Sequence, residues 1–229
     1  MSTTANLPRP IARKSAPLLE AGDRLSREEF ERRYDRMPHL KKAELIEGIV
    51  YMGSPVRIKN HARPHAVLAH WLMLFEEETP GVFAFDNGSV RLDGDNEPQP
   101  DLALCIESGF GGQASISDDD YLEGAPELAI EIAGSSTAYD LHQKKGAYRR
   151  NGVREYLVWI TGEERIVWWE LHDGEYREIS AEADGVLKSR VFPGLWLDAA
   201  ALLRGDLKKF RSVARAGVKS RAHAKFLRR

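Results

Sequence analysis

The chain has 229 residues, of which 42% are hydrophobic and 30% charged, and its formal net charge is −2. This length is enough for a large domain with a hydrophobic core, and the composition excludes a wholly disordered chain. The sequence shows no apolar run of the roughly 18 to 20 residues that a membrane-spanning helix needs, and no secretory signal pattern. The single cysteine, Cys105, excludes an internal disulfide framework. We therefore expect a cytoplasmic protein with no membrane association.

The chain is predicted to have three parts. Residues 1–25 are rich in Pro, Ala and Ser and lack periodicity, so we expect a flexible leader. Residues 26–203 are expected to form one folded domain. Residues 204–229 carry ten Lys or Arg against one acid, a net +9, which leaves −11 on the rest of the chain. This basic tail, expected to be helical, fits contact with nucleic acid, docking on the chain's own acidic body, or burial of an apolar helix face.

Local patterns predict the first elements of the domain. Ser26 followed by Glu29 is the pattern of a capping box and predicts a short helix. The stretch 43–55 alternates in hydrophobicity and turns at Gly48, which predicts a strand paired with its neighbour. Over 64–78 the apolar residues recur at helical spacing after a proline in the first turn, so this stretch is predicted to be a helix.

The middle of the sequence is rich in strand patterns. The runs "VFAF" and "SVRLD" flank Asp86–Asn87–Gly88, which predicts a β-hairpin. Further strands are predicted at "QPDLALCI", "PELAIEIA", "REYLVWI", "RIVWWEL" and "EYREIS". A helix is predicted between the second and third of these runs, ending at Asn151–Gly152. This order is typical of an α+β fold with a β-dominated centre.

Two acids interrupt runs that otherwise predict core strands. Asp101 lies in "QPDLALCI" and Glu131 in "LAIEIA", although charged side chains are rarely buried unless paired or bound to a cation. A sheet edge or a buried ion pair would explain either residue alone. If the two strands are neighbours, both carboxylates share one end of the sheet. Their hard oxygens then suit Mg²⁺ or Mn²⁺, with positions left for water and a phosphate.

The predicted helix after Glu131 adds a cation. Asp140, Lys144 and Tyr148 recur every four residues and therefore share one face. An ordinary ion pair between the first two explains this spacing equally well. A lysine facing two metal-bound carboxylates would instead orient the attacking water and offset charge on the phosphate. Glu44 is a further candidate carboxylate, although it is also explained as a residue that flanks a turn.

Other residues with known chemistry are interpreted as structural. His61 and His65 are spaced to share a helix face, but neither they nor His70 have a further ligand spaced for a zinc site. Trp168 and Trp169 are expected to pack the sheet rather than to stack on bases. The sequence shows no Gly-rich phosphate loop, nucleophile elbow or Cys–His nucleophile, which excludes P-loop hydrolases and common acyl transferases.

Four segments resemble a known family. "AELIEG", "EPQPDLAL", "PELAIEIAGSSTAYDLHQKKGAY" and "GVREYLVWI", in this order and spacing, are similar to the Uma-two family, which belongs to the PD-(D/E)xK nuclease superfamily. The resemblance covers residues 26–203. It implies a restriction-endonuclease-like fold, in which helices flank a mixed β-sheet, and a Mg²⁺- or Mn²⁺-dependent endonuclease that acts on DNA.

The resemblance also implies roles for individual residues. Asp101 of the "PD" and Glu131 of the "EIA" would bind the metal, with Glu44 in the position of the family's upstream acid. The superfamily's simplest pattern places the lysine where this sequence has Ala133. The resemblance implies that the lysine comes from the following helix, at Lys144. Lys145 faces about 100° away on a helix and ranks second.

Three functions remain open from the sequence. The first is a DNA endonuclease, the second a nucleic-acid-binding or regulatory protein without turnover on the same fold, and the third an RNA-processing or repair nuclease. The presence of Asp101, Glu131 and Lys144 together favours catalysis. A homodimer is left open, and neither a recognition sequence nor a strand preference is predicted.

Overall fold

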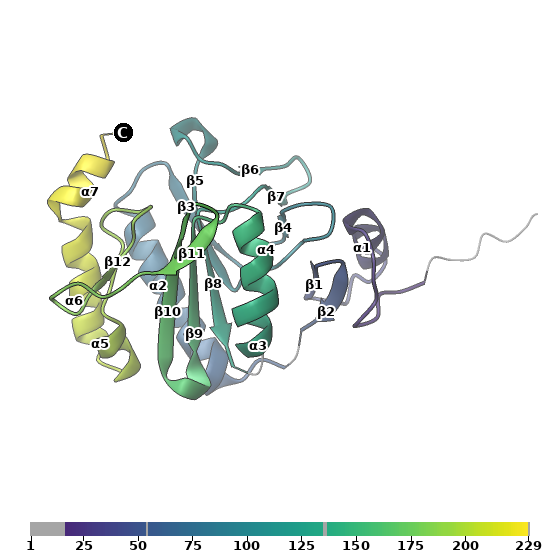
Figure 1. Ribbon diagram of the computed structural model, residues 1–229, viewed down its shortest axis with the longest axis horizontal. Helices are drawn as coiled ribbons and strands as arrows, with labels where there is room; N and C mark the ends of the chain where they lie inside the picture. The colour runs from purple at the N-terminus through teal and green to yellow at the C-terminus, as the bar shows by residue number, and fades with distance from the viewer. Residues whose placement is uncertain (1–16, 54, 135–136, 229) are drawn as a thin grey trace, which may run out of the picture.

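A six-stranded mixed sheet forms the centre of the molecule. The computed structural model describes residues 17–53, 55–134 and 137–228 (Figure 1). The strand order is β11–β10–β9–β8–β5–β3, in which β8 and β9 are parallel and the other neighbours antiparallel. The strands are β3 (Val82–Asp86), β5 (Leu102–Ile106), β8 (Leu128–Ala133), β9 (Glu155–Ile160), β10 (Arg165–His172) and β11 (Glu175–Glu178). The predicted α+β fold with a mixed sheet is confirmed.

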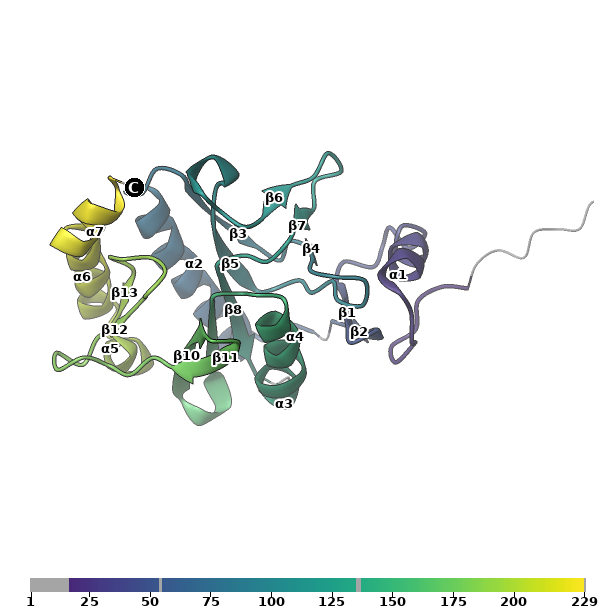
Figure 2. The same cartoon turned by 45° about the horizontal axis from the view of Figure 1, so that its top comes forward.

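Helices cover both faces of this sheet (Figures 1 and 2). One face packs on α2 (Arg63–Glu76), and the other on a continuous helical segment made of α3 (Thr137–Tyr139), η3 (Asp140–Lys144) and α4 (Lys145–Arg150). Successive side chains of a strand point to opposite faces. In β8, Ile130 and Ile132 therefore join the cluster with α2, while Ala129 and Ala133 join the cluster with α4. The same alternation directs Glu131 towards η3 and α4.

Smaller elements complete the described part of the chain. They are α1 (Arg27–Tyr34), the hairpin β1 (Ala43–Ile46) and β2 (Ile49–Met52), η1 (Ile58–Ala62), the three-stranded sheet of β4 (Val90–Arg91), β7 (Leu122–Glu123) and β6 (Ser115–Ile116), the turns η2 (Ser108–Phe110) and η4 (Thr161–Glu163), the pair β12 (Leu187–Lys188) and β13 (Trp196–Leu197), and α5 (Ala199–Leu203), α6 (Leu207–Val218) and α7 (Arg221–Phe226). The capping interaction before α1 is confirmed, because the Ser26 hydroxyl accepts from the Glu29 N–H. In the described residues no helix is long and apolar enough to cross a membrane.

The predicted hairpin around Asp86–Asn87–Gly88 is wrong. The chain does turn there, with Asn87 at a φ of 50°. However, β3 pairs with β5, and β4 leaves the main sheet to pair in parallel with β7. The physical reason is burial: Val90 packs with Cys105 and Leu122 in a separate apolar cluster. A local turn pattern carries no information on this long-range contact.

The described parts of the predicted leader and tail are both ordered against the rest of the molecule. Of the predicted flexible leader, residues 1–16 lie outside the described residues, whereas Leu19 is buried and the Gly22 N–H donates to the Val50 carbonyl at 2.8 Å. In the tail, α6 and α7 are helices, and Phe210 of α6 is buried in the main core beside α2. The tail therefore has an apolar face that packs into the core.

Candidate active site

Asp101 and Glu131 lie opposite each other at one end of the sheet. Strands β5 and β8 pair with Leu102 opposite Ile130, so the register places Asp101 opposite Glu131 one residue further along. Both acids are buried, with 4% and 2% of their surface exposed. Asp101 Oδ2 accepts the N–H of Ile132 at 2.8 Å, which orients its carboxylate along β8. The two carboxylates are thus neighbours, as the sequence predicts.

Lys144 completes this cluster from the helical layer. Its Nζ lies 2.9 Å from Glu131 Oε1 and 2.7 Å from Glu44 Oε1. The hydroxyl of Tyr148 donates to the same Glu131 oxygen at 3.0 Å. The backbone N–H of Gln99 donates to Glu44 Oε1 at 2.7 Å. The lysine is therefore held between two acids from β1 and β8, and the stripe predicted from the spacing faces the sheet.

The geometry of η3 explains how the stripe reaches the acids. Its five residues form a π-helical turn, which is wider than an α-helical turn and is frequent at functional sites. Asp140 and Lys144 are both 2% exposed at the two ends of this turn. The Tyr156 hydroxyl donates to the Asp140 carbonyl at 2.9 Å and ties the turn to β9. The turn thus holds Asp140 and Lys144 in the buried layer against the sheet.

Burial and charge act in opposite directions on the ionisable groups. Burial lowers the pKa of Lys144, but the charges of Glu131, Glu44 and Asp140 outweigh it, so the pKa lies well above its usual value. Burial raises the pKa of Glu131 to about 8 despite the charge of Lys144. Burial also acts to raise the pKa of Asp101, yet nearby cations, first Lys42, bring it below its usual value. The site thus stabilises an ammonium on Lys144 and a carboxylate on Asp101.

The structure places a lysine that the sequence did not indicate, and two histidines that we interpret as structural from the sequence, beside the candidate site. Lys42 Nζ lies 3.2 Å from both Asp101 Oδ1 and Asn87 Oδ1. The ring of His61 reaches the same carboxylate, with Nε2 at 3.6 Å from Oδ1. His65 Nε2 is 2.8 Å from the backbone carbonyl of Asp101. The interpretation of His61 as a surface or structural residue is therefore incomplete, because its half-buried ring contacts the candidate site.

The other residues considered from the sequence lie elsewhere. His70 is exposed on α2. Trp168 is buried and meets Trp71 edge to face at 5.8 Å, so it packs the sheet as predicted. Trp169 also packs, and the Nζ of Lys145 lies 3.8 Å above its ring. Lys145 thus points towards β10 and not to Glu131 or Glu44, which supports ranking it below Lys144.

The hairpin β1–β2 lies against the helical segment beside the cluster (Figures 1 and 2). The hydroxyl of Tyr51 donates to Gln143 Oε1 at 2.9 Å. The ring of Tyr51 packs on that of Tyr139 with centroids 4.2 Å apart, and Lys144 Nζ is 5.4 Å from the Tyr139 ring. The hairpin therefore supplies Glu44 and also shields the ammonium from water.

The carboxylate oxygens of the site suit Mg²⁺, which binds few protein ligands. Among the described residues, no three His, Cys, Asp or Glu side chains converge as a ligand set. Mg²⁺ usually binds one or two protein carboxylates and completes its shell with water and substrate phosphate. Asp101 and Glu131 offer such a pair of hard-oxygen ligands, and Lys144 contacts one oxygen each of Glu131 and Glu44. The metal-binding roles of all three acids stay predictions.

The fold and the arrangement of this cluster define a restriction-endonuclease-like protein. A family model described as "Putative restriction endonuclease", Uma2, matches residues 27–200, and the chain belongs to this family. A crystal structure described as a "putative nuclease" from Anabaena variabilis is similar, with a TM-score of 0.53 and 14% identity over 80% of this chain and 97% of that chain. No curated protein matches the chain. Family and fold together support a nuclease function.

Proposed function

We propose that the protein is a metal-dependent endonuclease that hydrolyses phosphodiester bonds of DNA. The observation that carries this proposal is the buried ammonium of Lys144, 2.9 Å from Glu131, where the register places Asp101 opposite Glu131. A lysine beside two adjacent carboxylates at the end of a sheet combines metal-binding oxygens with a donor for developing negative charge. An ion pair between Lys144 and Glu131 that served stability alone would not need a further carboxylate, that of Asp101, beside it.

Each side chain has a separate task in this proposal. Asp101 and Glu131 would hold Mg²⁺ or Mn²⁺, which supplies Lewis acidity and a more acidic bound water. Lys144 would donate to the attacking water and offset charge on the phosphate. Tyr148 orients Glu131 through its hydroxyl at 3.0 Å. Lys42, which is more exposed than Lys144, would place a second positive charge next to Asp101 where a phosphate enters.

The choice of DNA rests on the family description, which names restriction endonucleases. The site chemistry itself acts on a phosphodiester and does not select the sugar. Pure protein should therefore be incubated with single- and double-stranded DNA and RNA, with Mg²⁺ and with a chelator, beside Asp101→Ala. We expect cleavage of DNA that requires the metal and is lost in the variant.

Other outcomes of this experiment assign the protein differently. Cleavage restricted to RNA would keep the site and change the substrate. Nucleic-acid binding without cleavage, in the presence of Mg²⁺ or Mn²⁺, would favour a non-catalytic binding protein on the same fold. Equal cleavage by Asp101→Ala would place the activity outside this site and contradict the proposal.

A further inference from the structure

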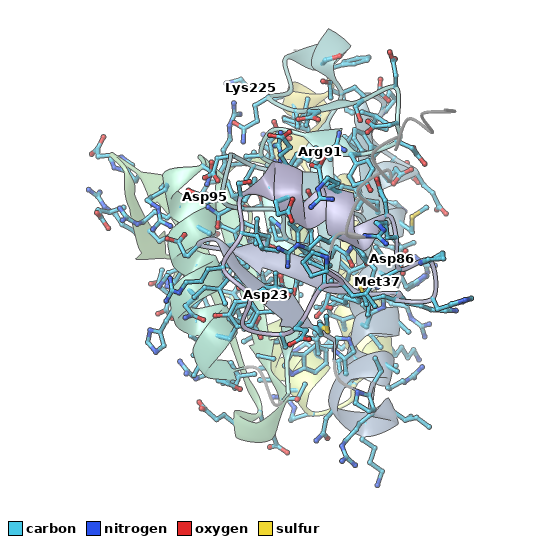
Figure 3. All side chains as sticks on the ribbon, turned by 90° about the vertical axis from the view of Figure 1, so that its right-hand side faces the viewer. Asp23, Met37, Asp86, Arg91, Asp95 and Lys225 are labelled. Carbon is cyan, nitrogen blue, oxygen red and sulfur yellow. The ribbon has the colours of Figure 1, made fainter. Side chains whose placement is uncertain are left out.

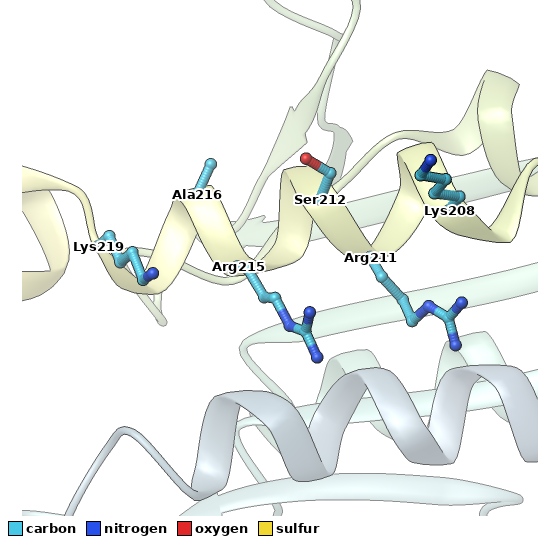
Figure 4. A pocket seen from close by; sticks show the side chains of 6 residues that line it. All are labelled: Lys208, Arg211, Ser212, Arg215, Ala216 and Lys219. Carbon is cyan, nitrogen blue, oxygen red and sulfur yellow. The ribbon is translucent and has the colours of Figure 1, made fainter.

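Helix α6 carries a row of cations on its exposed face (Figure 4). Two adjacent ridges of the helix line an open hollow, and they consist of Lys208, Ser212 and Ala216 on one side and Arg211, Arg215 and Lys219 on the other. All six residues are exposed. Figure 4 shows Arg211 and Arg215 extending to the same side of the helix. The small side chains of Ser212 and Ala216 leave space beside them, so the guanidinium groups are open to a ligand.

These cations are not neutralised by the protein. Over 17–53, 55–134 and 137–228, no carboxylate lies within ion-pair distance of Lys208, Arg211, Arg215 or Lys219. The acids near the helix have other partners: Asp206 caps α6 by accepting from the Lys209 N–H, and Asp198 pairs with the Lys209 ammonium. The cations of the hollow therefore keep their full charge for a partner.

Several arginines elsewhere have carboxylate partners. Arg165 pairs with Glu163, and Arg149 pairs with Glu175. Arg91 is held by three carboxylates. On α6, in contrast, four cations without a carboxylate partner among the described residues follow one another along one helix face.

The opposite face of α6 fixes the row in place. Phe210 and Ala214 are buried in the main core, and Gly217 packs so closely on the Gly194 carbonyl that a Cβ there would collide with it. Helix α6 lies on the α2 side of the sheet, whereas the candidate active site faces η3 and α4 (Figures 1 and 2). The cations therefore stand on a fixed backbone, so binding has to order their side chains but not the helix that carries them.

We propose that this face of α6 binds the phosphate backbone of nucleic acid, as a second contact surface outside the active site. From Lys208 to Lys219 the row extends about 16 Å along the helix axis. Duplex DNA carries a charge about every 1.7 Å along its axis, so a duplex offers several phosphates over this length. Arginine binds phosphate through two parallel N–H donors. The contact is independent of sequence, because it reaches only the backbone.

This inference rests on the proposed function for its choice of nucleic acid as the anion. The test measures binding rather than cleavage, so the two proposals fail separately. Short duplex DNA is titrated with the full chain in the presence of a chelator, at salt concentrations from about 50 to 200 mM. The variant replaces Lys208, Arg211, Arg215 and Lys219 by Gln. The charge-matched control replaces Arg149, Arg165, Arg177 and Arg190, which have carboxylate partners, by Gln.

We expect the α6 variant to bind at least about 10-fold more weakly at low salt and its log–log salt slope to fall in magnitude by about 3 to 4, since each phosphate contact contributes about 0.9. The control should change the slope far less. An α6 variant with the slope and affinity of the wild type overturns the proposal, whether or not the wild type cleaves DNA. Loss of binding to anionic lipid vesicles, with DNA binding unchanged, would assign the face to a membrane surface and also overturn it.

Discussion

Lys144 shows how burial determines the role of one residue. A fully buried ammonium costs several kcal/mol in lost hydration unless it is paired. Here, contacts of 2.7 Å and 2.9 Å to Glu44 and Glu131 offset that cost. Because of these contacts, Lys144 stabilises the fold in addition to its proposed catalytic role. On sequence alone, Lys144→Met would be expected to leave the fold nearly unchanged, but the structure predicts a loss of stability, because the variant leaves two buried acids without their cation.

We expect Lys144→Met to lower the rate of DNA cleavage by about 100-fold or more, the scale seen when a charge-stabilising donor is removed. We also expect it to lower the free energy of unfolding by about 3 kcal/mol. The loss should be smaller if Glu131 takes up a proton in the variant. The rate should be measured under single-turnover conditions at a temperature where both proteins are folded. Lys145→Met is the matched control, since its ammonium lies over Trp169. Equal loss of activity in Lys145→Met, or full activity in Lys144→Met, would contradict the catalytic role of Lys144.

Residues of the site differ in how far the sequence can predict them. Asp101 and Glu131 are recognisable because a charge inside an apolar strand is unusual. The position of Lys42 can be explained only once the structure is known. It stands two residues before Glu44, and alternation along a strand places both side chains on one face. His61 has no such signal. It reaches Asp101 because the π-helical turn η1 folds back onto the sheet, which is a tertiary contact.

At the scale of single elements, α1 is attached to the rest of the molecule through its buried Phe30 and also through charge. Arg91 of β4 binds Glu31 of α1 at 2.9 Å, and it also binds Asp119 and Glu123. Figure 3 shows Arg91 beside α1 on this side of the molecule. Glu97 is 1% exposed next to Glu31. Burial, followed by the hydrogen bond and charge of Glu31, raises the pKa of Glu97 to about 9.

This pKa predicts a pH dependence of stability. Because the pKa of Glu97 is higher in the folded than in the unfolded protein, its contribution is complete below the ordinary value of 4.5 and is lost as the pH rises towards about 9. Glu97→Gln, which keeps a neutral group of the same shape, should therefore gain stability relative to wild type as the pH rises from 5 to 9. Denaturant unfolding at several pH values measures this difference. A difference that does not vary with pH would show that Glu97 is not held protonated.

At the scale of the whole molecule, the sequence predicts the elements better than their partners. The strands of the central sheet and the helix over 64–78 were identified by local periodicity, and α2 spans Arg63–Glu76. The pairing of β3 with β5 and of β4 with β7 joins segments through burial of residues such as Val90, which no local pattern encodes. The basic tail likewise had three open interpretations, and only the packing of Phe210 shows that its apolar face enters the core.

The central proposal is that Asp101 and Glu131 together bind a divalent metal. Calorimetric titration of Mn²⁺ into wild type, Asp101→Ala and Glu131→Ala tests it most directly, with the exposed-acid variant Glu163→Ala as the control. We predict measurable binding by wild type and the control and a loss of at least about 10-fold in affinity in each site variant, since each loses a charged oxygen ligand. Circular dichroism checks that each variant is folded. Unchanged Mn²⁺ affinity in both folded site variants would contradict the account.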